Sequence, residues 1–237
     1  ETTMEVLIPD FQGKYALIGG SQKDYNATLL HLGWMNVLQP LIQKGDIEIV
    51  LDQFVDNWEA DEAYKIVNDY LSDSSNPGLD VVIAGNDELA GGVIKALDEH
   101  DLLREVLVAC QDAEVEAIQN IVAGYQTISI YKPINALAYT AANMAMQLAN
   151  EEGPINTNLT VNNGHKLVPS VLLSSQVVNK ENIQMTVVSE GFMSEEDIYE
   201  LSFLNTRVNE KIDPNVFSLE TPENFTVEVI KLENGQK

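Results

Sequence analysis

The 237-residue chain carries 37 acidic and 13 basic side chains, giving a formal net charge of −24. Nucleic acids and anionic lipid surfaces are bound through Lys and Arg, so this balance disfavours both classes of partner. No run of the sequence reaches the roughly 18 apolar residues of a membrane-spanning helix. The first residues show no basic and apolar signal segment, so we expect any such segment to lie outside this chain.

Apolar runs typical of strands alternate with amphipathic segments typical of helices between residues 14 and 132. Helices between buried strands imply βαβ units, so we predict an α/β fold with a doubly wound parallel sheet. The predicted strands are 14–20, 47–52, 79–85, 106–110 and 127–131. Apolar residues at helical spacing between them are Leu30, Trp34, Val37, Leu38 and Leu41, then Ala63, Ile66, Val67 and Tyr70, then Leu89, Val93, Ile94 and Leu97.

The pattern changes after residue 132. Pro133 suits the first turn of a helix, which we expect to extend to about residue 149. The chain becomes extended again over 166–178, and Ser194 with Asp197 resembles a capping box that opens a short helix. Residues 201–237 lack clear periodicity apart from a strand-like run at 225–232, so we expect an appended tail or a small β element.

Five polar or aromatic residues follow the five predicted strands: Asn26, Trp58, Asn86, Asp112 and Lys132. Ligands bind at the carboxyl ends of strands in open parallel sheets, so these residues are expected at one site. Amide, carboxylate and ammonium groups together supply the donors and acceptors that neighbouring sugar hydroxyls need. An indole plane suits the C–H face of a sugar ring. The set therefore predicts a carbohydrate site.

Each of these residues also has a purely structural interpretation. Asn26, Asn86, Asp87 and Asp112 are all suited to cap helices. Trp58 can be a core or interface residue, and Lys132 can be an ordinary surface lysine. The recurrence of such residues at one edge of the sheet favours the site over these alternatives.

Catalytic and cofactor motifs are absent from the sequence. The three histidines lie far apart without metal-ligand spacing, and neither a G-x-S-x-G elbow nor a phosphate-binding loop occurs. The stretch after the first strand, GGSQKDYN, is not the dinucleotide fingerprint G-x-G-x-x-G. Cys110, the single cysteine, reads as a buried small hydrophobe. We therefore predict no cofactor, no metal and no enzymatic activity. An acid–base pair of Asp112 and Lys132 is the one catalytic alternative.

Several runs resemble the D-xylose-binding proteins of bacterial ABC import, which have the type I periplasmic sugar-binding fold. They are KYALIGGSQKDYNA, LQPLIQKGDIEIVLDQFVDNW, VVIAGNDELAGGVIKAL, QDAEVEAIQNIVAGYQTISIYKPI and LTVNNGHKLVPSVLL, spread over residues 5–195. The most specific pieces are GND-x-x-AGG and GYQT-x-x-x-YKPI. The resemblance implies that Trp58 stacks on a pentose ring. It implies that Asn26, Asn86, Asp112 and Lys132 hydrogen-bond the pentose hydroxyls.

The resemblance also implies a division of the chain. Members of this family have two lobes, and residues 1–132 with 160–200 match the C-terminal sugar-binding lobe. Residues 133–159 match a helix that crosses to the N-terminal lobe, most of which is missing, and 201–237 form an extension that we cannot match. We therefore expect the stripe of Leu137, Ala141, Ala145 and Leu148 to be exposed, or covered by a separate chain that supplies the N-terminal lobe.

The functional prediction that follows is binding of a pentose, D-xylose first, as part of the solute-binding protein of an ABC transporter. The expected partners are the monosaccharide and an ABC permease, without nucleic acid. The alternative is an extracytoplasmic xylose sensor that signals to a membrane histidine kinase. Either function places the protein in the periplasm or outside the cell. Both functions are also compatible with a membrane anchor in a segment outside this chain.

Overall fold

A six-stranded sheet forms the framework of this computed structural model, which describes residues 12–151, 153 and 155–200. The tail predicted at 201–237, with its strand-like run at 225–232, lies outside the described residues. The strands lie in the order β2–β1–β3–β4–β5–β8, and the first five pair in parallel, as predicted. Their bounds are β1 (Gly13–Gly19), β2 (Ile47–Phe54), β3 (Val81–Ala84), β4 (Leu107–Gln111), β5 (Ile128–Tyr131) and β8 (Gln176–Val178).

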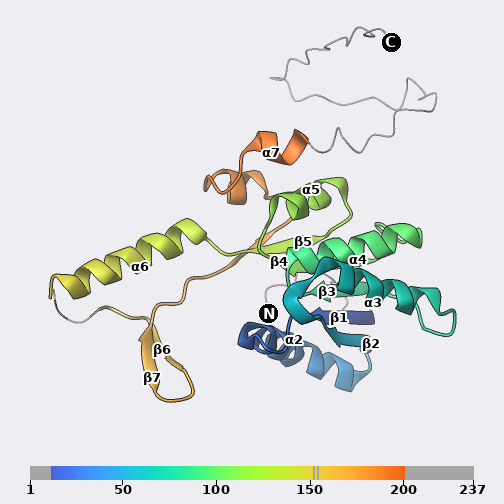
Figure 1. The fold of residues 1–237 in the computed structure, drawn as a ribbon, viewed down its shortest axis with the longest axis horizontal. Coiled ribbons are helices and arrows are strands. Elements are labelled where there is room, and N and C mark those ends of the chain that lie inside the picture. The colour runs from blue at the N-terminus through green and yellow to red at the C-terminus, as the bar shows by residue number, and fades with distance from the viewer. Residues whose placement is uncertain (1–11, 152, 154, 201–237) are drawn as a thin grey trace, which may run out of the picture. The chain divides into compact units, whose positions relative to one another are not determined.

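Helices cover both faces of the sheet, which confirms the doubly wound α/β fold (Figure 1). Successive strand residues point to opposite faces, so Tyr15 and Leu17 pack under α2 (Tyr25–Lys44). Ala16 and Ile18 of the same strand pack under α3 (Ala60–Ser72) and α4 (Asp87–Glu99).

A third hydrophobic cluster lies beside β5 and β8. It joins α5 (Val115–Ala123), the π-helical turn η2 (Gln184–Val188) and α7 (Glu195–Glu200). The predicted capping box opens α7: Ser194 Oγ donates to Asp197 Oδ2 at 2.6 Å and accepts from the Asp197 amide at 3.2 Å.

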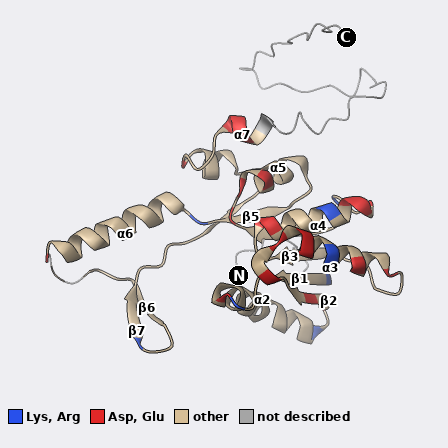
Figure 2. Cartoon of the chain, in the orientation of Figure 1, with Lys and Arg blue, Asp and Glu red and all other residues tan. Residues whose placement is uncertain are grey.

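The segment between β5 and β8 packs differently from the rest of the described chain. It contains α6 (Ile134–Ala149) and an antiparallel hairpin of β6 (Leu159–Asn162) and β7 (Leu167–Ser170). No residue of α6 is buried, and Leu137 and Leu148 are 53% and 63% exposed, as the predicted stripe requires. Figure 2 shows α6 free of charged residues, whereas acidic residues are frequent on α3 and α4. Among the described residues, no helix has the length and apolar character needed to cross a membrane.

Candidate functional site

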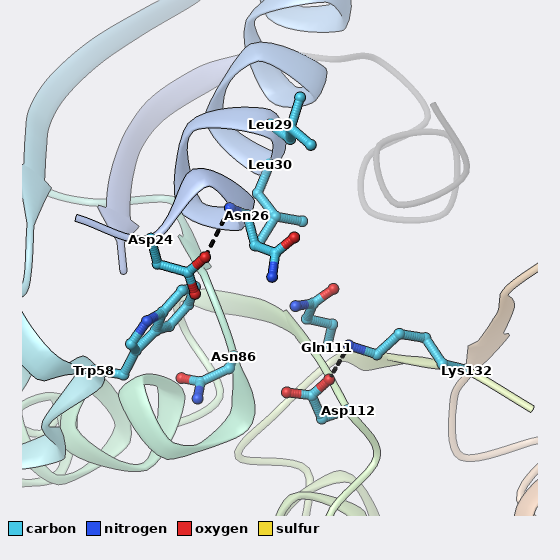
Figure 3. A pocket seen from close by; sticks show the side chains of 9 residues that line it. All are labelled: Asp24, Asn26, Leu29, Leu30, Trp58, Asn86, Gln111, Asp112 and Lys132. Atoms are coloured by element: carbon cyan, nitrogen blue, oxygen red, sulfur yellow. Dashed lines mark hydrogen bonds and ion pairs between the residues drawn. The ribbon is translucent and has the colours of Figure 1, made fainter. Parts of the chain in front are cut away.

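A cavity of about 480 Å³ opens at the carboxyl ends of the parallel strands. All five residues predicted from the strand ends line it, and Figure 3 shows their side chains around one space. The complete lining is Asp24, Asn26, Leu29, Leu30, Trp58, Asn86, Gln111, Asp112 and Lys132. The five predicted residues are up to 106 positions apart, and the fold brings them together because each follows a different strand of one sheet.

The start of α2 directs Asn26 into the cavity. Asp24, rather than Asn26, is the N-cap: its Oδ1 accepts the Asn26 backbone amide at 2.9 Å. The capping interpretation of Asn26 is therefore wrong. Within the described part of the chain no hydrogen bond engages the Asn26 side chain, which leaves its carboxamide available as both donor and acceptor.

Trp58 lies on a seat made by two glycines. A Cβ at Gly20 would lie 2.3 Å from each of Trp58 Cε2, Cε3 and Cη2, which alternate around the six-membered ring. A point at equal distance from three alternating ring atoms lies over the ring centre, so Gly20 covers one face of the indole. At Gly85 a Cβ would lie 2.8 Å from Trp58 Cζ3. Only the opposite face of the ring can therefore contact a ligand.

The backbone before the indole is unusual. The short helical turn η1 (Asp56–Trp58) contains Asn57 and Trp58, whose φ angles are +59° and +61°. Left-handed conformations are disfavoured for residues that carry a Cβ, and they occur where the surrounding structure imposes them. Trp58 is partly buried against the core cluster of α3 and α4, and it also lines the cavity. It is therefore both a core residue and a residue of the candidate site.

Asn86 combines a structural role with a place in the cavity. Its Oδ1 accepts the Leu89 amide at 3.0 Å and so caps α4, as its alternative interpretation proposed. This bond uses the acceptor side of the carboxamide and leaves the Nδ2 donor to the cavity. Asn86 therefore offers a donor with a fixed orientation.

Asp112 and Lys132 form an ion pair at the far wall, with 2.5 Å between Asp112 Oδ1 and Lys132 Nζ. Their side chains are 30% and 50% exposed, so both remain accessible from the cavity. Asp112 does not cap α5, whose N-cap is Glu114 without a side-chain bond. The pair presents an acceptor and a donor side by side, which is the arrangement that two adjacent hydroxyls need.

Asp87 directly follows Asn86 in the chain and is almost fully buried, with 6% of its surface exposed. Its carboxylate accepts from Ser129 Oγ at 2.8 Å, from the Glu114 amide at 2.7 Å and from Cys110 Sγ. Burial raises the pKa of Asp87 to about 6 despite these hydrogen bonds. Cys110 is buried, as predicted, and burial raises the pKa of its thiol.

Four of the lining residues were not predicted to belong to the site: Asp24, Leu29, Leu30 and Gln111. Of these, Leu30 was predicted only as part of the apolar face of its helix. Leu29 and Leu30 lie three and four residues after Asn26, and this spacing puts all three on one helix face. That signal was present in the sequence. Gln111 directly follows the predicted strand 106–110, but the prediction names Asp112 beside it instead; the structure makes Gln111 the last residue of β4. Among the residues that the structure describes, no group of three His, Cys, Asp or Glu side chains could hold a metal ion.

Comparison with known proteins points to one family. A sequence model described as a periplasmic binding protein domain matches residues 3–153. The chain is 45% identical over 187 residues to the D-xylose-binding periplasmic protein of Escherichia coli (strain K12), covering 79% of this chain and 56% of the relative. The protein of the same description from Haemophilus influenzae is also 45% identical, over 188 residues, with the same two coverages.

A solved structure gives the same picture. The carbohydrate transporter solute binding protein from Chloroflexus aurantiacus, in complex with D-glucose, aligns with a TM-score of 0.69 and 27% identity. The alignment covers 78% of this chain and 61% of that chain. The present chain thus spans a little over half the length of the curated relatives that it matches.

Proposed function

The chain belongs to the periplasmic binding protein domain family, and we propose that it forms one lobe of a pentose-binding protein of an ABC transporter. The proposed ligand is D-xylose, which is bound and delivered to a permease without chemical conversion. Both curated relatives at 45% identity are named for D-xylose binding in the periplasm, which supports the ligand and the compartment. The alternative of a sensor for a membrane histidine kinase gains no support from these comparisons.

The composition of the cavity carries the proposal. One face of the Trp58 indole is covered by Gly20, so the free face is a flat apolar surface of the kind that stacks on a sugar ring. The amides of Asn26 and Asn86 and the ion pair of Asp112 with Lys132 surround that surface with donors and acceptors. We propose that these five residues contact the pentose.

A titration with sugars tests this function. The chain has two tryptophans, so Trp34→Phe leaves Trp58 as the single indole reporter. We expect D-xylose to change the fluorescence of this variant and to release heat in calorimetry. Trp58→Ala should weaken binding by about 10-fold to 100-fold, because a stacked aromatic residue contributes roughly 1.4–2.8 kcal/mol. Wild-type protein that binds no aldopentose, together with a silent Trp58→Ala substitution, would refute the function.

We also propose that an N-terminal lobe, on the same polypeptide or on a separate chain, completes the binding shell and covers α6. The exposed stripe of α6 and the partial coverage of the relatives both support this. A separately produced N-terminal lobe of the E. coli relative provides a test. Light scattering should detect a 1:1 complex, and D-xylose should bind more tightly to the complex than to the chain alone. Two lobes that remain separate at high concentration with sugar present would contradict this proposal.

A further inference from the structure

One buried carboxylate links three neighbouring strands, β3, β4 and β5, through hydrogen bonds. Asp87 follows β3, and its Oδ2 accepts the Glu114 amide beyond the end of β4 at 2.7 Å. Its Oδ1 accepts the hydroxyl of Ser129 in β5 at 2.8 Å and the thiol of Cys110 in β4. Ser129 Oγ in turn accepts the Ala113 amide at 3.0 Å. Two consecutive amides of one turn are therefore fixed, directly or through Ser129, by Asp87.

That turn presents Asp112 to the cavity, and its backbone is strained. Asp112 and Ala113 have φ angles of +111° and +55°, both in the region that favours glycine. Such conformations persist only where surrounding contacts impose them. The Asp112 amide donates to Ile130 O at 2.9 Å on one side, and the Asp87 network holds the next two amides on the other. Without the network, the turn loses the contacts that keep the Asp112 side chain beside Lys132.

We propose that Asp87 is a positioning residue of the sugar site, which sets the orientation of Asp112 and, through the ion pair, of Lys132. This inference rests on the proposed sugar-binding function. Asp87 does not line the cavity, so it acts on the ligand only through the turn. An ionised carboxylate suits this position because it only accepts, and a hydroxyl, a thiol and an amide all direct donors at it.

Hydrogen exchange measured by NMR tests the link from Asp87 to the turn without any sugar. In Asp87→Ala the Ala113 and Glu114 amides should exchange about 10-fold faster than in the wild type, since Glu114 loses its acceptor and Ser129 is released. Asp80→Ala is the matched control. The Asp80 carboxylate also accepts a backbone amide across strands, that of Lys14 at 2.7 Å, but at the opposite end of the sheet.

Affinity for D-xylose, measured by calorimetry, tests the effect on the site. Asp87→Ala should bind D-xylose about 10-fold more weakly, and Asp80→Ala within about 2-fold of the wild type. Asp87→Asn should retain affinity within about 3-fold, because its carboxamide oxygen can still accept from Glu114 while its NH₂ donates to Ser129 Oγ. Rescue by this conservative variant separates positioning of the turn from a need for the charge itself.

Each outcome decides the proposal. Unchanged turn exchange, unchanged affinity in Asp87→Ala, or equal affinity losses in Asp87→Ala and Asp80→Ala would overturn it, and so would Asp87→Asn binding as weakly as Asp87→Ala. If Asp87→Ala fails to fold, Ser129→Ala takes its place. It keeps the carboxylate but leaves the Ala113 amide without its acceptor, and should lose about 3-fold in affinity. If the wild type binds no aldopentose, the proposed function fails, and the positioning role fails with it.

Discussion

The seat under Trp58 makes Gly20→Ala the sharpest perturbation of the cavity. The new Cβ would lie 2.3 Å from three ring atoms and therefore about 1.8 Å above the ring plane. Carbon atoms in contact normally lie about 3.5–4.0 Å apart, so the indole must move by roughly 1.5 Å. Gly20 blocks one side of the ring, so this movement is directed into the space proposed for the sugar.

Two consequences follow from Gly20→Ala. Overpacking of this kind costs about 1–3 kcal/mol of unfolding free energy, which urea denaturation measures. Displacement of the stacking plane should weaken D-xylose binding by about 10-fold or more, measured by calorimetry. In the Trp34→Phe background the fluorescence of Trp58 should change even without sugar.

Gly91→Ala is the control for this experiment. Gly91 lies inside α4, and a Cβ there meets nothing within 4 Å. This variant should leave affinity unchanged and raise stability by up to about 1 kcal/mol, because alanine favours a helix over glycine. Gly20→Ala with wild-type affinity and wild-type fluorescence would show that the indole is not seated as described.

Three further predictions concern charge, pH and the exposed helix. Lys132→Gln should weaken sugar binding by about 10-fold. Its unfolding free energy should change by less than about 1 kcal/mol, because the ion pair with Asp112 is partly exposed. An unchanged affinity would show that Lys132 does not contact the sugar. Burial raises the pKa of Asp87 to about 6. Between about pH 4 and pH 6 the Asp87 carboxyl is therefore protonated in the folded state and ionised in the unfolded chain. This stabilisation is complete below about pH 4 and is lost as pH rises through 6. Urea titrations should therefore show wild type losing about 2 kcal/mol relative to Asp87→Asn between pH 4 and pH 7. Parallel curves would contradict a raised pKa of the buried Asp87 carboxyl. Leu137→Glu with Leu148→Glu should change unfolding of the chain by less than about 0.5 kcal/mol, yet abolish binding of an N-terminal lobe in light scattering.

Periodicity predicted the sheet because four of the five parallel strands, β1, β3, β4 and β5, are largely buried and consist mostly of apolar residues. The edge strand β2 alternates more polar residues with apolar ones, and only Ile47 of it is buried. The strand β8 could not be predicted in the same way, since it has three residues and pairs antiparallel with β5 across a long insertion. The strand-end rule likewise located the cavity, because parallel strands place the residues that follow them at one edge.

The individual roles of the site residues were harder to predict. Asp24 and Asn26 are both residues that cap helices, and sequence cannot tell which of two neighbours does so. Asp87 looked like another cap, whereas its actual partners are contributed by β4, β5 and the turn after β4. The seat of Trp58 depends on backbone approach at Gly20 and Gly85, which leaves no periodic signal in the sequence.

The antiparallel pairing of β8 with β5 has a consequence for the modularity of this lobe. Tyr131 lies directly opposite Gln176, so the two ends of the segment 132–175 are one strand spacing apart, about 5 Å. The whole segment, with α6 and the hairpin, therefore occupies the place that a hairpin turn between β5 and β8 would take. A two-residue hairpin turn placed between Lys132 and Ser175 would close the gap. Such a shortened protein would keep all nine cavity-lining residues and lose the apolar helix, giving a minimal domain that carries the whole of the proposed sugar site.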